Sequence, residues 1–310
     1  MKKRRRLSII PLAAVGLVIA TSSPVQAQKS EPRAYANTPT DVNFISLGYA
    51  WSNGNVLLDP ALPIENLDAN INVGIFQMSH AFSLGGDNAK IKFAIPWQAG
   101  DWEGTLEGIP ESQKEQGVGD AWVGVDWLFS GAPALTLAEF PTYHAGRVLG
   151  VGLRVSMPTG DYDSSELLNL GSNRWSLRSE FAASQTWDQW TLESVASVRI
   201  FSDNDELLGT RTLEQKPIWA VKGSAIYSLS RPGWWTSFSV AYGEGGKTRV
   251  DGVSKQTKQE NWRFGATFSM PLAERHGISV RIDSGINDGA GSDFDSVSLF
   301  YTYQQGGRGS

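Results

Sequence analysis

The chain has three histidines and no cysteine, which restricts the catalytic and metal chemistry open to it. His80, His144 and His276 have no second histidine or carboxylate at the spacing of a zinc motif such as H-E-x-x-H. A serine hydrolase on a β-strand would most simply have serine and histidine two residues apart on one face. No serine occupies those positions beside any of the three histidines. We therefore predict no catalytic residue, no metal site, no cofactor and no enzymatic activity.

A second set of chemically useful residues consists of charged side chains inside otherwise apolar segments. Each of them alternates with apolar neighbours, so all of them would lie on the strand face opposite the apolar one. Mixed charges along a passage set which solutes cross it, but opposite charges can also pair across the passage and close it. The lumen-lining candidates are Arg154, Arg178, Glu180, Glu193, Arg199, Lys222, Arg263, Arg281 and Asp283.

The elements that would position these charges are segments with strict period-two alternation. The clearest example is residues 261–270. One face carries Trp262, Phe264, Ala266, Phe268 and Met270, and the other carries Asn261, Arg263, Gly265, Thr267 and Ser269. Similar segments predict twelve strands, at residues 44–51, 68–82, 89–97, 121–129, 149–157, 175–183, 190–200, 219–229, 234–242, 261–270, 278–286 and 297–303.

The second of these segments is the least regular. Its apolar face is assigned to Ile71, Val73 and Ile75, and its alternation blurs after Phe76.

Three features favour a transmembrane barrel over a soluble sandwich. The segments are long enough for a tilted membrane crossing, and twelve is an even number, as in bacterial single-chain barrels. Aromatic residues stand near strand ends, where they would meet lipid headgroups. These residues are Trp51, Trp97, Trp175, Trp187, Trp190, Trp219, Trp234 and Tyr303. The predicted fold is an all-β, antiparallel up-and-down transmembrane barrel of about twelve strands.

The links between segments alternate between short and long, as the periplasmic turns and outer loops of such barrels do. This parity predicts that both termini lie in the periplasm. One link that should be short, residues 131–147, is long. Thr136 and Glu139 within it fit a capping box at a helix start. Both a short helix or ordered loop across the inner end of the barrel and an irregular turn remain open.

The N-terminal region has the pattern of a secretory signal. Residues 2–6 are all basic, residues 7–20 are apolar, and Val25 and Ala27 suit a cleavage site. The predicted organisation is a signal peptide (1–27), a flexible N-terminal tail (28–42), the barrel (43–303) and a C-terminal tail (304–310). The net charge is −5, and removal of the five basic residues brings it to −10, which argues against a nucleic-acid partner.

Two acidic segments, residues 160–163 and 203–206, could hold calcium through alternate oxygen ligands. Solvated turns are the alternative that we favour.

Residues 158–163 (PTGDYD) and 167–175 (LLNLGSNRW), with 131–135 (GAPAL) and 201–205 (FSDND), resemble a known family. The chain is similar over most of its mature length to outer-membrane proteins of the "putative MetA-pathway of phenol degradation" family. The resemblance implies an outer-membrane barrel linked to the handling of aromatic compounds. The family usually ends on a strand that closes with an aromatic residue, whereas here Tyr303 is followed by seven further residues.

The sequence and the resemblance together predict a bacterial outer-membrane channel, monomeric and surrounded by lipid. Its role would be passive uptake of a small hydrophobic or aromatic solute, and the nature of that solute is implied by the resemblance alone. Two alternatives stay open. One is a structural or adhesive barrel with a plugged lumen, and the other is an outer-membrane lipid hydrolase.

Overall fold

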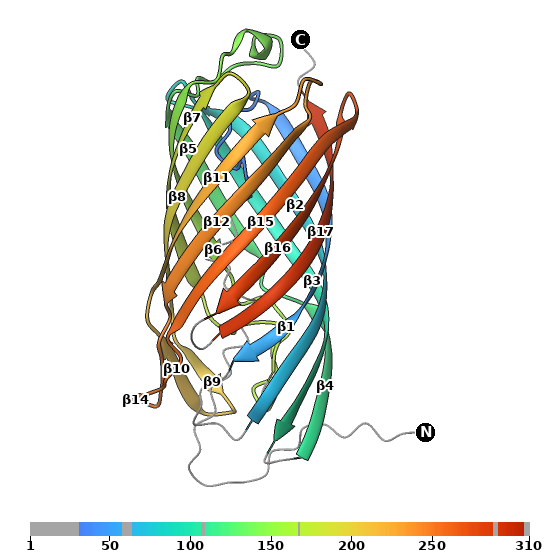
Figure 1. Ribbon diagram of the computed structural model, residues 1–310. Helices are drawn as coiled ribbons and strands as arrows, with labels where there is room; N and C mark the ends of the chain where they lie inside the picture. The colour runs from blue at the N-terminus through green and yellow to red at the C-terminus, as the bar shows by residue number, and fades with distance from the viewer. Residues whose placement is uncertain (1–30, 58–63, 107–108, 167, 288–290, 307–310) are drawn as a thin grey trace.

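Twelve antiparallel strands close into a barrel (Figure 1), which confirms the predicted fold class. The computed structural model describes residues 31–57, 64–106, 109–166, 168–287 and 291–306. Each barrel strand pairs with the next along the chain, and the first pairs with the last. The barrel strands are β1 (Val42–Leu57), β2 (Ile64–Leu84), β3 (Asp87–Leu106), β5 (Trp122–Ser130), β6 (Arg147–Ser156), β7 (Ser176–Trp187), β8 (Trp190–Phe201), β11 (Ile218–Ser228), β12 (Trp235–Gly245), β15 (Gln259–Ala273), β16 (His276–Asn287) and β17 (Gly291–Gly306).

The two ends of the barrel differ. At one end, called here the turn end, the short links 85–86, 188–189, 229–234 and 274–275 join the strands. The opposite loop end carries the long connections between β3 and β5, β6 and β7, β8 and β11, and β12 and β15, as the sequence predicts, whereas β16 and β17 are separated there by only three residues. Figure 1 shows the turn end at the top and the loop end at the bottom.

Several loop-end regions that the sequence predicts as loops are strands. β3 continues past the predicted boundary and pairs with β4 (Ile109–Val118). A separate small sheet contains β9 (Asn204–Leu207), β10 (Arg211–Gln215), β13 (Thr248–Val250) and β14 (Val253–Ser254). These stretches are polar on both faces or very short, so they lack the alternation on which the sequence analysis depends. Pairing with neighbouring strands forms them instead.

The outer surface of the barrel is an apolar belt. Six of the seven tryptophans predicted at strand ends are exposed, with 52% exposure for Trp175 and 49% for Trp97. Between them lie exposed aliphatic and aromatic side chains such as Leu153 and Phe181. Since such a surface is stable only against lipid, the protein is an outer-membrane barrel.

Among the described residues, no helix is long and apolar enough to cross a membrane.

The face assigned to the second predicted strand is wrong. Ile71 in β2 is only 9% exposed and faces the lumen, whereas Phe76 and Met78 point to the lipid, with 37% and 42% exposure. The lumen face of the loop-end half of β2 is therefore apolar. Its outward face at this level carries Asn70 and Asn72, which accept hydrogen bonds from Trp51 and Tyr49. Alternation separates the two faces of a strand but does not say which one meets lipid when both carry apolar residues. In β2, one face carries Ile71 and Ile75 and the other carries Phe76 and Met78.

The long link at the turn end is an ordered loop with a single 3-10 turn, Phe140–Thr142. The capping box is present, because the Glu139 carboxylate accepts bonds from the Thr136 amide (2.9 Å) and hydroxyl (2.8 Å). These two bonds hold the pKa of Glu139 below its usual value. The loop projects beyond the strand ends in Figure 1.

Candidate functional site: the lumen and its plug

The lumen is occupied on its turn-end side by the chain itself. Residues 31–41, called here the plug segment, precede β1 and fold back into the barrel instead of extending away from it. Tyr35 is 2% exposed and packs with Leu128, Val148 and Val195, which belong to three different strands of the wall. The sequence predicts a flexible tail over residues 28–42, and its composition gives no sign of this insertion. Residues 28–30, like the predicted signal peptide, lie outside the described residues.

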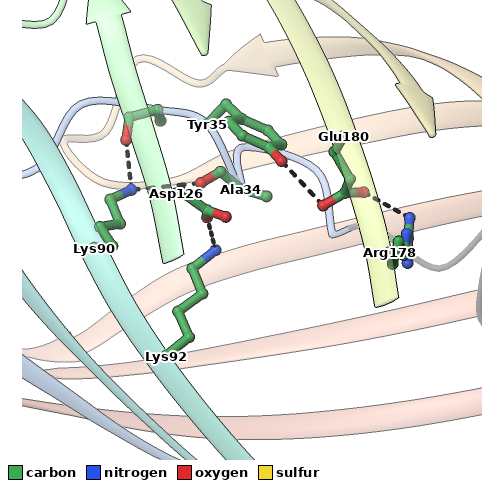
Figure 2. A network of polar contacts seen from close by, with 8 residues as sticks. Ala34, Tyr35, Lys90, Lys92, Asp126, Arg178 and Glu180 are labelled. Atoms are coloured by element: carbon green, nitrogen blue, oxygen red, sulfur yellow. Dashed lines mark hydrogen bonds and ion pairs between the residues drawn. The ribbon is translucent and has the colours of Figure 1, made fainter. Parts of the chain in front are cut away.

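Charged side chains of the barrel strands bind the plug segment around Tyr35 (Figure 2). The Tyr35 hydroxyl donates to Glu180 Oε2 at 2.9 Å, and Glu180 Oε1 pairs with Arg178 at 2.6 Å. From the opposite side, Lys90 Nζ donates to the carbonyl oxygens of Ala36 (2.7 Å) and Ala34 (3.4 Å). Hydrogen bonds from two strands, β7 through Glu180 and β3 through Lys90, thus hold the plug segment.

Two further groups support this arrangement. Lys92 forms an ion pair with Asp126 beside the plug. Glu193 accepts hydrogen bonds from the backbone of Arg33 and Tyr35. Glycine at position 152 allows the close approach of the plug, because a Cβ there would lie 2.3 Å from the Tyr35 hydroxyl oxygen.

The base of the plug segment is attached to the long turn-end link. Asn37 Nδ2 donates to the Pro133 carbonyl at 3.1 Å, and the Thr40 amide donates to the Leu135 carbonyl at 2.8 Å. Asn88 Nδ2 donates to the Thr38 carbonyl at 2.6 Å. The exceptional length of residues 131–146 therefore has a structural role, because this link holds the entry of the plug into the barrel.

All nine predicted lumen-lining residues lie on the inner face of the barrel. Six are buried, with exposures of 3–8%, and the other three are partly buried. The buried ones are Arg178, Glu180, Glu193, Lys222, Arg263 and Asp283. The nine residues together occupy β6, β7, β8, β11, β15 and β16, and the lumen face of these strands is called here the charged wall.

The charged wall contains ion pairs as well as unmatched charge. Arg281 pairs with Asp283 in β16 at 2.6 Å, an ion pair of the same type as Arg178–Glu180 in β7. Arg154, Arg178 and Arg199, in contrast, stand directly opposite one another across three adjacent strands. Like charges in register repel, so this row needs compensation.

A fourth arginine joins this row from the loop before β7, within the family motif at residues 167–175 and outside the predicted lumen-lining residues. Arg174 precedes β7, is 4% exposed and donates through Nη2 to Gln215 Oε1 at 2.5 Å. Its guanidinium carbon lies 4.6 Å from the ring centre of Phe201, and that of Arg199 lies 5.1 Å from the same ring. Burial lowers the pKa of Arg174 to about 10, so it remains a cation at neutral pH. We call Arg154, Arg174, Arg178 and Arg199 the arginine cluster.

The opposite part of the lumen is apolar at the loop end. The lumen faces of β2, β3 and β17 bring together Ala69, Ile71, Val73, Trp102 and Phe294, called here the apolar strip. Phe294 is 3% exposed and Ala69 is 1% exposed. The alternation in residues 68–82 did not predict this strip, because Ile71 and Val73 were expected on the lipid face.

The acidic segments at the loop end are engaged in the chain's own hydrogen bonds. Asp161 Oδ2 accepts from the Val118 amide at 2.8 Å, and Asp163 Oδ1 accepts from the Ser165 amide at 2.9 Å. Asn204 Nδ2 donates to the Tyr162 hydroxyl at 3.0 Å, which joins the two segments. In the described part of the chain, no group of three or more His, Cys, Asp or Glu side chains is placed to hold a metal ion.

Two of the histidines have defined partners, and neither partner is a serine. His80 Nδ1 lies 2.9 Å from Asn43 Oδ1, and His276 Nδ1 lies 2.5 Å from the Tyr301 hydroxyl. His144 is an exposed residue of the turn-end link.

Other functional residues were only partly visible in the sequence. Lys90 and Lys92 alternate with the apolar residues of the third predicted strand, so their lumen position follows from the pattern. Tyr35 and Arg174 carry no such signal, because both stand outside the alternating segments.

Comparison with solved structures shows the same fold. The crystal structure of the COG4313 outer membrane channel from Pseudomonas putida F1 matches with a TM-score of 0.76 at 20% identity, over 89% of this chain and 100% of that one. The beta domain of the Bordetella autotransporter BrkA matches with a TM-score of 0.53 at 10% identity, over 86% and 100% of the two chains. The transport unit of the autotransporter AIDA-I from Escherichia coli matches with a TM-score of 0.51 at 8% identity, over 90% and 95%.

A search of curated proteins finds no match. The family model described as "Putative MetA-pathway of phenol degradation" matches residues 36–303, which include all twelve barrel strands up to Tyr303. The resemblance inferred from the loop motifs is thereby confirmed, and the chain belongs to this family.

Proposed function

We propose that this protein is a passive outer-membrane channel for a small hydrophobic or aromatic solute. The observation that carries the proposal is the apolar strip on the lumen face. A barrel that passes only hydrophilic solutes has a polar interior. Here Ile71, Trp102 and Phe294 instead present apolar side chains on the lumen side of the loop end. A hydrophobic solute would leave water on this surface before it meets the charged wall.

The plug segment supports a gated passage. Besides the apolar contacts of Tyr35, the plug is held to the wall by hydrogen bonds of Tyr35, Lys90 and the turn-end link, which can exchange with water. Movement of residues 31–41 would open the turn-end half of the lumen without unfolding a barrel strand. The proposal includes a monomer with the turn end, where β1 begins and β17 ends, in the periplasm. The alternation of short turns and long loops supports that orientation.

The test is the entry of N-phenylnaphthylamine, a neutral aromatic fluorophore that an intact outer membrane excludes, into bacteria that express the full-length chain. We expect a faster fluorescence rise than in cells without the protein, and a slower rise for Ile71→Asn. Ser298→Asn, a change on the lumen face of β17 outside the apolar strip, serves as the matched control. Equal rates with and without the protein would overturn the proposal.

A structural or adhesive barrel is the second candidate, and the plugged lumen favours it. Single-channel recording in planar bilayers separates the two functions. A channel gives discrete conductance steps that become larger or more frequent when residues 31–40 are deleted. A structural barrel with a filled lumen gives no steps in either form.

We further propose that the protein is not an enzyme. The environments of His80 and His276 support this proposal, because their ring nitrogens contact Asn43 and Tyr301 and not the serine that a lipid hydrolase of this kind would use. Phospholipid hydrolysis by the purified protein, lost on substitution of any one histidine, would contradict it.

A further inference from the structure

We propose that the arginine cluster is a binding site for the carboxylate of an aromatic acid. This inference rests on the proposed channel function and specifies the chemical class of the solute. The solute would be an amphipathic anion, with an aromatic body and a carboxylate, and would not be a neutral hydrocarbon.

The first argument is charge. Three arginines from β6, β7 and β8 occupy directly opposed positions, and Arg174 joins them from the neighbouring loop. Glu180 forms an ion pair with the cluster through Arg178. Asp120 and Asp203 also act electrostatically on Arg174. Among the described residues, however, Arg199 has three cationic neighbours, Arg154, Arg174 and Arg178, against one carboxylate neighbour, Asp120, so positive charge is in excess around it in a partly buried site. Such a site favours an anion, because unpaired buried charge is costly.

The second argument is an unused donor. Arg174 is 4% exposed, and its Nη1 is buried and has no hydrogen-bond partner among the described residues. Its Nη2 already donates to Gln215, so the orientation of the guanidinium group is fixed. Arg199 is oriented in the same way, since its Nε and Nη2 donate to Ser176 Oγ at 3.0 and 2.9 Å. A planar carboxylate matches the geometry of guanidinium donors. The cluster already binds one carboxylate of the chain, that of Glu180, through Arg178.

The third argument is the aromatic lining of the cluster. The Arg154 guanidinium carbon lies 3.9 Å from the ring centre of Trp122. On the other side, Arg174 and Arg199 both contact Phe201. Aromatic faces beside cations suit an aromatic ring attached to the carboxylate.

The position of the cluster fits a solute that travels from the loop end. Arg178 is bound to Glu180, which in turn holds the plug through Tyr35. A solute at the cluster would therefore lie against the plug segment.

The test is equilibrium dialysis of radiolabelled benzoate against the purified full-length protein in detergent. We expect saturable binding that unlabelled benzoate competes away and that benzyl alcohol, its neutral counterpart, does not. The double variant Arg174→Gln/Arg199→Gln should weaken benzoate binding at least tenfold. Arg281→Gln, which removes the same charge from the wall outside the cluster, is the matched control and should stay within twofold of wild type. Heat-dependent mobility on gels confirms that each variant is folded.

Three results would overturn the inference. These are benzoate binding that the double variant leaves unchanged, equal competition by benzyl alcohol, and displacement by chloride or acetate as effective as that by benzoate. The last result would identify a general anion site. Failure of the channel function is distinguishable, because the entry of neutral N-phenylnaphthylamine does not require the arginines. Benzoate binding without fluorophore entry would refute the channel and keep the site.

Discussion

The charged wall and the apolar strip line one lumen and arise from one alternating pattern. Different interactions stabilise their side chains: ion pairs in the charged wall and apolar packing in the strip. The charged wall buries Arg178 and Glu180 against each other and uses the pair to hold the plug. The apolar strip buries Phe294 and Ile71 against other apolar side chains and holds nothing polar. In the first region, stability depends on keeping each charge with its partner. In the second region, it depends on filling volume.

The largest expected effect comes from breaking the buried ion pair. Glu180→Leu leaves the Arg178 guanidinium group without its carboxylate and should lower the free energy of unfolding by about 3–5 kcal/mol. The double variant Arg178→Met/Glu180→Leu should recover most of this loss, because an apolar pair needs no charge compensation. Urea unfolding of the protein in phospholipid vesicles measures both. If the double variant is as unstable as the single one, the pair is not the source of the effect.

The apolar strip should respond next most strongly. Phe294→Ala creates a cavity in the strip and should cost roughly 3 kcal/mol in the same unfolding assay. Phe238→Ala is the control, because Phe238 faces lipid with 55% exposure and lipid chains can fill the space. Equal losses for the two variants would mean that the strip is not a packed interior.

A smaller effect is expected at the contact between plug and wall. Tyr35→Phe removes one hydrogen bond to a charged acceptor, about 1.5–3 kcal/mol, and should raise the open population of the plug roughly tenfold to hundredfold. Hydrogen exchange of the amides in residues 31–41 reports this opening. Tyr227→Phe removes a hydrogen bond to Gln189 in the turn 188–189, outside the plug segment, and is the control. Unchanged exchange in Tyr35→Phe would show that other contacts hold the plug.

The smallest effect tests the orientation of β2. Ile71→Val should cost about 0.5–1.5 kcal/mol if Ile71 is packed inside the lumen. Ile282→Val, at a lipid-facing position with 57% exposure, should cost less. A larger loss of stability for Ile282→Val than for Ile71→Val in urea unfolding would indicate that Ile71 faces lipid.

Much of the barrel could be predicted from the sequence. The segment from Trp262 to Met270 alternates without a break, and twelve such segments gave the strand count and the link parity. The same alternation placed charged residues such as Arg178 and Asp283 on the inner face. It could not place Arg174, since this residue belongs to no strand and reaches the cluster only because its loop packs beside Phe201.

The sequence by itself therefore determined the barrel, its lipid belt and the side of each strand that carries charge, because all three follow from a local repeat of two residues. Only the tertiary structure decided that Ile71 faces inward, that Tyr35 fills the lumen and that four arginines meet. Each of these depends on contacts between segments far apart in the chain, such as the bond from Tyr35 to Glu180, and a local repeat carries no information about such contacts.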